Sequence, residues 1–107
     1  MNEKTLLALK GSIKKWKKII NKTGVDNGQL NCPLCKLFIR DECESCPVNE
    51  KTSGYGCHAS PYGKWEEHQD KNHFATYVET LTLKNECEKC EFLAKKEKAF
   101  LESLLPK

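Results

Sequence analysis

Several features that mark particular protein classes are scarce in this 107-residue sequence. It has one arginine, Arg40, no long apolar run, and a mean hydropathy of -0.67. The missing apolar run argues against a membrane-spanning helix. Because arginine is the usual side chain that reads base edges, the single arginine argues against base-specific recognition of nucleic acid. Residues 1–10 (MNEKTLLALK) lack the basic and apolar stretches of a secretory signal, so we expect a cytoplasmic protein.

Seven cysteines stand out against this background. A domain of this length buries only about 60–70% of its unfolded surface, so its stability is marginal and a covalent or metal staple is useful. Seven cysteines cannot all pair in disulfides. In the reducing cytosol, clustered Cys-x-x-Cys pairs bind metal or perform redox chemistry more often than they form structural disulfides. The cysteines are therefore expected to bind metal.

Residues 4–23 are predicted to form an amphipathic helix that ends at Gly24 in a left-handed conformation. Seven lysines and one acid, Glu3, give the first 23 residues a charge of +6 within a chain of net charge +3. Five apolar residues recur at spacings of three and four and form one stripe that must be buried: Leu6, Leu9, Ile13, Trp16 and Ile20.

Turn-forming residues concentrate between residues 25 and 65, which we expect to be a cysteine-rich knuckle region with little regular structure. Ordering so long a loop in a small protein is costly without cross-links. Five of the seven cysteines fall in this segment, which is consistent with a metal that organises it.

Helical spacing returns over residues 65–105. Asn85 is predicted to cap the last helix, with Glu88 closing a capping box, and Glu97 interrupts its apolar side. A lysine of the first helix is a candidate partner for Glu97. Trp16 and Trp65 are expected in the core. One helical face is formed by Phe74, Tyr77, Val78 and Leu81, and the apolar side of the last helix by Leu93, Ala94, Phe100, Leu101, Leu104 and Leu105.

A first metal site is expected among the five cysteines of the middle segment, because two residues between cysteines make a tight turn that aims both sulfurs at one ion. Cys32 and Cys35 are taken as ligands, together with two of Cys43, Cys46 and Cys57. The choice among these three stays open. Zinc is favoured, and an iron–sulfur cluster is the alternative.

A second site is expected around Cys87 and Cys90, which lie three residues apart at a predicted helix start, where thiolates are favoured. His68 and His73 are the natural additional ligands, because their spacing matches that of histidines in mixed Cys/His zinc sites. A redox dithiol is the alternative for this pair, but no βαβ pattern surrounds it. The chain would thus hold one or two metal ions.

The lysine-rich first helix favours non-specific binding of nucleic acid phosphates or of an acidic protein surface. Lysines flank its apolar stripe, and no acidic residues are placed to form ion pairs with them across a helix dimer. Pairing with a second copy is therefore disfavoured and a monomer is expected. The lysines concerned are Lys10, Lys14, Lys15, Lys17, Lys18 and Lys22.

The sequence resembles small, uncharacterised cysteine-rich proteins of phages, archaeal viruses and related genomes. The resemblance rests on NCPLC at 31–35, CESCPV at 43–48, GCHASPYGKW at 56–65, His68, CEKC at 87–90 and FLESLLP at 100–106, and covers about four-fifths of the chain in its order of motifs. It implies a metal-stapled protein of viral or mobile-element type, located in the host cytoplasm if viral. It implies no reaction.

Together these features predict one small, α-rich, metal-stapled domain over residues 1–107. Its basic N-terminal helix would pack on C-terminal helices, with the knuckle region between them. The favoured function is non-enzymatic binding of nucleic acid or a host protein, without a membrane. The first alternative is a protein-interaction or inhibitor module that does not bind nucleic acid. The second is a zinc-scaffolded nuclease that uses His58, His68, Asn72 and His73.

Overall fold

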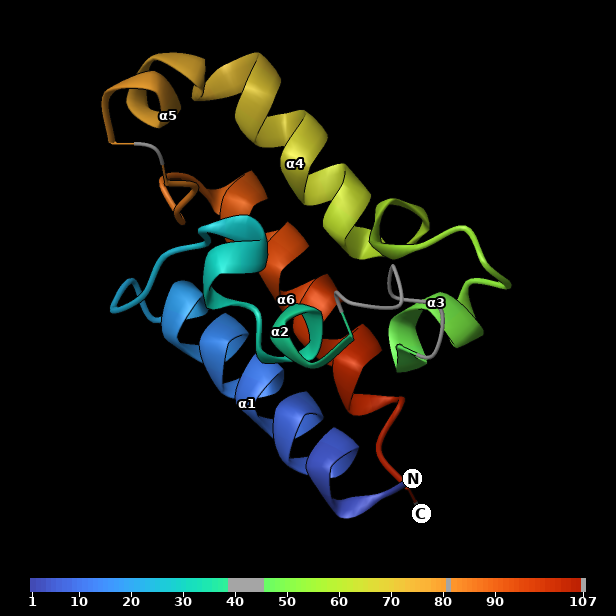
Figure 1. The fold of residues 1–107 in the computed structure, drawn as a ribbon. Helices are drawn as coiled ribbons and strands as arrows, with labels where there is room; N and C mark the ends of the chain where they lie inside the picture. The colour runs from blue at the N-terminus through green and yellow to red at the C-terminus, as the bar shows by residue number, and fades with distance from the viewer. Residues whose placement is uncertain (39–45, 81, 107) are drawn as a thin grey trace.

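The computed structural model describes residues 1–38, 46–80 and 82–106. This part of the chain is predominantly helical, which confirms the expected α-rich class (Figure 1). Arg40, Cys43 and Leu81 lie outside the described residues. In chain order the elements are α1 (Glu3–Ile20), η1 (Gly28–Asn31), α2 (Pro33–Phe38), α3 (Pro47–Lys51), η3 (Cys57–Ala59), α4 (Pro61–Asn72), α5 (Phe74–Thr80) and α6 (Glu88–Glu102).

Helix α1 begins where Asn2 caps it, with the Asn2 side chain accepting a hydrogen bond of 2.8 Å from the Thr5 N–H. Its buried line differs slightly from the predicted stripe. Leu6, Ile13 and Ile20 are only half-buried at its edges. The residues at its centre are Thr5, Leu9, Ser12, Trp16 and Ile19. Because Thr5 and Ser12 are polar, the spacing of apolar residues alone did not indicate this buried line.

The end of α1 corrects the prediction for Gly24. The helix ends at Ile20, and the residue with a left-handed conformation is Lys22, at φ 63°. Glycine is needed at position 24 for space instead, since a Cβ atom there would lie 2.7 Å from the Cβ of Lys18. The chain folds back tightly against the last turn of the helix.

Helix α6 packs against both α1 and α4, and α2 covers part of α1 (Figure 1). Packing of the N-terminal helix on a C-terminal helix therefore agrees with the sequence analysis. Trp16 of α1 and Trp65 of α4 meet edge to face, with ring centroids 5.1 Å apart, and both are buried as expected. The remaining core comprises Leu9, Ile19, Leu34, Cys46, Val48, Cys90, Leu93, Ala94 and Leu101.

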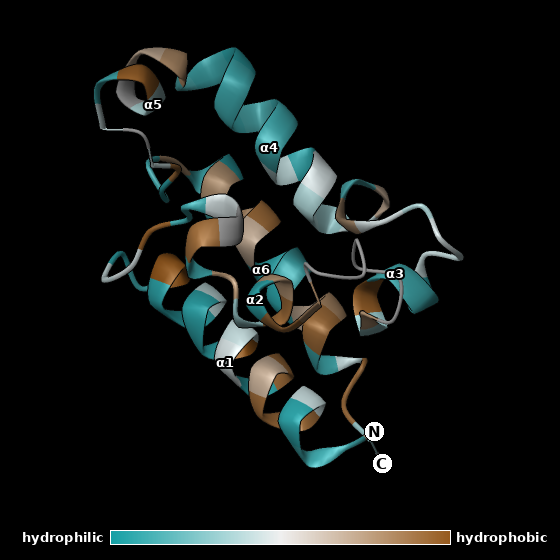
Figure 2. Ribbon diagram, in the orientation of Figure 1, coloured by the Kyte–Doolittle hydropathy of each residue, from teal (hydrophilic) through white to brown (hydrophobic). Residues whose placement is uncertain are grey.

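Helix α4 offers little apolar surface to this core. Its ribbon is mostly hydrophilic (Figure 2), and within α4 only Trp65 and Gln69 are buried. The Gln69 amide donates a hydrogen bond of 3.0 Å to the Lys84 carbonyl. Half-buried Tyr62 adds an edge-to-face contact with Trp16, so two aromatic residues provide most of the hydrophobic packing of α4.

A buried carboxylate, Asp26, joins the segments around that tryptophan. It is 1% exposed and accepts hydrogen bonds from Lys15 Nζ at 2.8 Å and Trp65 Nε1 at 3.0 Å. Its backbone forms an antiparallel bridge with Leu83. Asp26 therefore connects α1, α4 and the segment before α6, and sequence analysis did not identify it.

Other expectations are corrected by the structure. The region 25–65 is more regular than predicted, because α2 and α3 each start at a proline that is compatible with a first helical turn. The N-cap of α6 is Cys87 rather than Asn85. The Asn85 amide instead donates a hydrogen bond of 3.0 Å to the carbonyl of Ile20, at the end of α1.

Glu97 is buried at 5% exposure in α6 and accepts a hydrogen bond of 3.3 Å from the Ser60 hydroxyl. Sequence analysis expected a lysine of the first helix as its partner. Lys15 of α1 acts on Glu97 electrostatically, but its ion pair is with Asp26. Burial raises the pKa of Glu97 to about 8, although the bond with Ser60 opposes this shift. The Glu97 carboxyl is thus mostly protonated in the folded protein at neutral pH.

None of the helices in the described segments is long and apolar enough to cross a membrane.

Replacing Asp26 by alanine should lower the free energy of unfolding by about 3–5 kcal/mol, because it leaves the buried Lys15 ammonium and the Trp65 N–H without their partner. Urea denaturation measures this loss. The exposed acid Asp70 provides a control, and D70A should change stability by no more than about 0.5 kcal/mol. Equal effects of D26A and D70A would contradict the role of Asp26.

The second prediction concerns Glu97 and pH. The folded chain holds the Glu97 proton more tightly than the unfolded chain, whose carboxyl has a pKa near 4.5. This contribution to stability is complete below pH 4.5 and is lost as pH rises towards 8. E97Q keeps the shape without the ionisation, so its melting temperature should exceed the wild-type value at about pH 8 and approach it at about pH 5. A difference that is independent of pH would contradict the burial of an ionisable Glu97.

Candidate metal centre

The end of α4 and the start of α6 bring four potential ligands together. His68 lies in α4, His73 is its C-cap, Cys87 is the N-cap of α6, and Cys90 lies in the first turn of α6. One ligand atom from each residue lies within 4.8 Å of all the others, close enough to hold a metal ion. The structure thus assembles the set of two histidines and two cysteines that the spacing indicated.

The distances within this group are close to those around a single ion. Bond lengths to a tetrahedral zinc imply edges of about 3.8 Å between two sulfurs and about 3.6 Å between a sulfur and a nitrogen. Cys87 Sγ lies 3.4 Å from Cys90 Sγ, 3.2 Å from His68 Nε2 and 3.4 Å from His73 Nε2. The four side chains are therefore arranged for coordination with little rearrangement.

Outer partners orient the histidines. Glu86 lies 3.1 Å from His73 Nδ1, the carboxylate–histidine arrangement that commonly supports a metal ligand. The Asn72 side-chain amide nitrogen lies 3.0 Å from His68 Nδ1 and donates a hydrogen bond of 3.1 Å to the His68 carbonyl, so it contacts the edge of the ring that faces away from Cys87. Both Nε2 atoms are thereby presented to the centre.

The two thiols differ in their surroundings. Burial raises the pKa of Cys87, but hydrogen bonds from the Cys90 N–H, His68 and His73 outweigh it and bring the pKa to about 6. Burial raises the pKa of the Cys90 thiol, and the Gln69 amide donates a hydrogen bond of 3.2 Å to its sulfur. Cys87 is thus mostly thiolate at neutral pH, whereas Cys90 would release a proton on metal binding.

Comparison of the chain with protein-family models, curated proteins and solved structures gives no match. The resemblance to cysteine-rich viral proteins stays a prediction, and the site is interpreted from its geometry.

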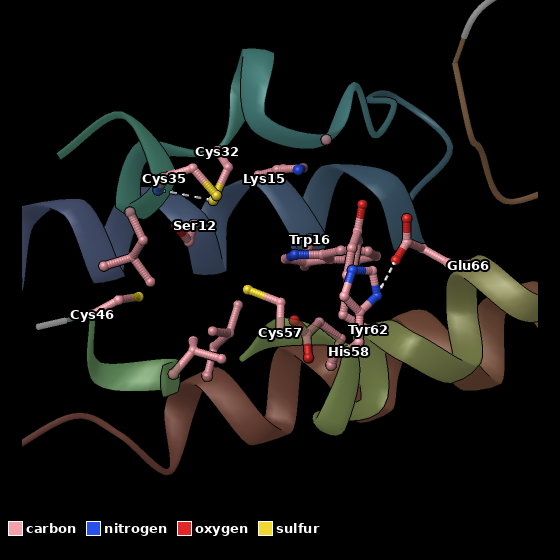
Figure 3. Close-up of a pocket in the computed structure, with 15 residues that line it drawn as sticks. Ser12, Lys15, Trp16, Cys32, Cys35, Cys46, Cys57, His58, Tyr62 and Glu66 are labelled. Carbon is pink, nitrogen blue, oxygen red and sulfur yellow. Dashed lines mark hydrogen bonds and ion pairs between the residues drawn. The ribbon is translucent and has the colours of Figure 1, made fainter. Parts of the chain in front are cut away.

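The other described cysteines lie at a separate place. Cys32, Cys35, Cys46 and Cys57 line one cavity of about 320 Å³ between α1, α2, α3, η3 and α6 (Figure 3). Among the described residues, they do not form a group as close as that at His68. A hydrogen bond with Cys35 lowers the pKa of Cys32 to about 6, against the opposing effect of burial. Cys43, the fifth predicted ligand of this site, lies outside the described residues.

The lysines expected to contact a partner are divided by the structure. Lys15 is paired with Asp26, and its side chain is only 9% exposed, so it belongs to the interior rather than to a binding surface. The exposed members of the set are Lys10, Lys14, Lys17, Lys18 and Lys22. His58 was a candidate for nuclease chemistry. Its Nδ1 lies 2.8 Å from a carboxylate oxygen of Glu66, and it is not part of the group formed by His68, His73, Cys87 and Cys90.

Sequence analysis missed the outer partners Gln69, Asn72 and Glu86. Weak signals were available for each of them. Asn72 lies four residues after His68, one helical turn away, and Glu86 directly precedes Cys87. Nothing in the sequence alone paired Gln69 with Cys90, because 21 residues separate them.

Replacing Cys90 or His73 (C90S, H73A) should remove one equivalent of bound metal and release the end of α4 from α6. A loss of about 2 kcal/mol would lower the melting temperature by roughly 10 °C in a domain of this size. Elemental analysis and thermal circular dichroism measure the two effects. H58A, at an exposed histidine, is the control and should retain the metal. Full metal content in C90S and H73A would contradict the centre.

Proposed function

We propose that the protein is a zinc-stapled binding protein that acts without catalysis. The observation that carries this proposal is the set of His68, His73, Cys87 and Cys90 at near-tetrahedral separations. Two imidazoles and two thiolates suit zinc, which prefers mixed nitrogen and sulfur ligands in tetrahedral geometry. The ion would supply folding energy by joining α4 to α6.

The ligand count supports a structural rather than a catalytic ion. A catalytic zinc keeps one position for water or substrate, whereas four protein ligands close a tetrahedral site. The nuclease alternative needs His68 or His73 as a reactive group, yet both direct Nε2 to the cysteines. The centre therefore favours a binding protein over an enzyme.

The exposed lysines of α1 and the following turn support non-specific binding of nucleic acid. Lys14 and Lys18 line a shallow groove with Gly11, Thr23 and Gly24. The one acid in α1, Glu3, lies at its far end. Lysines without neighbouring acids can lie along phosphates and release counterions on binding. Without an arginine in this groove, base-specific contacts are not proposed.

An apolar surface on α5 favours the alternative, a protein partner. Phe74 is 56% exposed, Tyr77 42% and Val78 55%, so three of the four apolar residues predicted to share one helical face are exposed to solvent. Exposed apolar groups of this kind are found at protein interaction sites. Their position directly after the C-cap His73 places them beside the proposed zinc centre.

Salt dependence distinguishes the two partners. We expect binding to duplex DNA of arbitrary sequence at low salt, measured by fluorescence anisotropy, with an affinity that falls as salt rises. K14Q/K18Q should weaken binding and reduce the salt slope by about 0.9 for each lost phosphate contact.

The matched control is K95Q/K98Q, which removes the same charge from α6 and should preserve binding. Absence of binding at low salt would contradict the nucleic-acid function and leave a protein partner. Equal losses in both variants would show that net charge, rather than the α1 surface, is responsible.

A further inference from the structure

The cavity between α1 and the short helices contains an unusual concentration of thiols. Four separate backbone positions supply them: Cys32 just before α2, Cys35 within α2, Cys46 at the N-cap of α3, and Cys57 at the start of η3. Figure 3 shows the Cys32, Cys46 and Cys57 side chains around the same hollow, approaching it from different directions. Three separate segments of the chain thus contribute cysteines to the lining of one cavity.

We propose that this cavity binds an iron–sulfur cluster, with Cys32, Cys35, Cys46 and Cys57 as its ligands. Four cysteine thiolates are the usual ligand set of such clusters. The proposal is independent of the zinc centre, because it uses none of the four residues of that centre and a different metal.

The turn at Cys32 has the local geometry of a metal-binding loop. The Cys35 N–H donates a hydrogen bond of 3.3 Å to Cys32 Sγ. Pro33, between them, fixes a backbone angle and has no N–H of its own. A backbone N–H directed at a cysteine sulfur stabilises the thiolate and is one means by which proteins tune clusters.

The spread of the sulfurs favours a cluster over a single ion. At the His68 centre the ligand atoms already lie within 4.8 Å of one another. The four cysteines around the cavity are not gathered in this way among the described residues, although they line a space of about 320 Å³. A cluster distributes its cysteine ligands over several iron atoms, so its thiolates lie farther apart than those around one zinc.

The walls of the cavity are part apolar and part charged. Trp16, Leu34 and Leu101 contribute buried apolar surface. Lys15 lines the same space, but its ammonium is already paired with Asp26, and two glutamates line the cavity as well. The apolar residues would shield a bound group from solvent on their side of the cavity.

A polar side chain in the wall is directed at one of the cysteines. The Ser12 hydroxyl is buried in α1 and lines the cavity. Its interaction with Cys32 contributes to the lowered pKa of that thiol. A hydroxyl beside a cysteine sulfur favours its thiolate form, which is the form that binds metal.

The test is purification of the full chain without oxygen, followed by reconstitution with ferric iron and sulfide in the presence of dithiothreitol, which supplies any electrons that the cluster needs. We expect a brown protein with the charge-transfer absorption of a cluster and about two to four iron and sulfide ions per chain. A chain that stays colourless after reconstitution would overturn the proposal. Binding of a second equivalent of zinc that is lost in C32S/C35S would also overturn the proposal.

Variants assign the ligands and separate the two centres. C32S/C35S should lose iron and sulfide but retain zinc, and its retained zinc and helical circular dichroism would show that it folds. C87S/C90S should show the reverse pattern of metal loss. C57S should also lose the cluster and retain zinc. Retention of the cluster in C57S would overturn the assigned ligand set.

Failure of this proposal is distinguishable from failure of the proposed function. Zinc and iron are measured separately, and DNA binding has its own readout at the α1 lysines. A protein with zinc and no iron in any variant would leave the zinc-stapled binding protein intact and remove the cluster alone.

Discussion

The buried Asp26 carboxylate is the interaction on which the arrangement of the helices depends. It accepts hydrogen bonds from Lys15 in α1 and Trp65 in α4, and its backbone pairs with Leu83 ahead of α6. A buried charge is stable only with good partners, and its partners are correct only when all three segments are in place. Asp26 therefore contributes to the selection of one arrangement of weakly apolar helices, in addition to any net stability that it provides.

This constraint matters because the hydrophobic core is unevenly distributed. Helices α1 and α6 share an extensive apolar interface, whereas α4 contributes mainly Trp65 and Tyr62 at its first two turns. The residues at the far end of α4 compensate for this. His68 and His73 approach Cys87 and Cys90, so coordination would fasten the helix where packing does not. Metal coordination at the helix ends would thus compensate for the small apolar surface of α4.

The sequence predicted the elements that depend on local pattern. Spacing located α1 and α6 to within a few residues but not the start of α4, and histidine and cysteine spacing identified the ligands that meet at the ends of α4 and α6. It failed where partners are distant in sequence. Asp26 lies 39 residues from Trp65, and Asn85 lies 65 residues from Ile20, whose carbonyl it binds rather than capping α6. Such contacts follow from the tertiary arrangement, which no local pattern encodes.

The packing of α1 on α6 has a consequence for synthesis on the ribosome. These helices are separated by most of the chain, so when α1 leaves the exit tunnel only α2 can cover part of it, and the surface that packs on α6 stays exposed until α6 follows. All seven cysteines lie between Trp16 and Leu93 and are translated before that interface can close. Every thiol is therefore solvent-accessible in the nascent chain. Protection of these thiols during translation depends on the surrounding cell rather than on the fold that later buries Cys46 and Cys90.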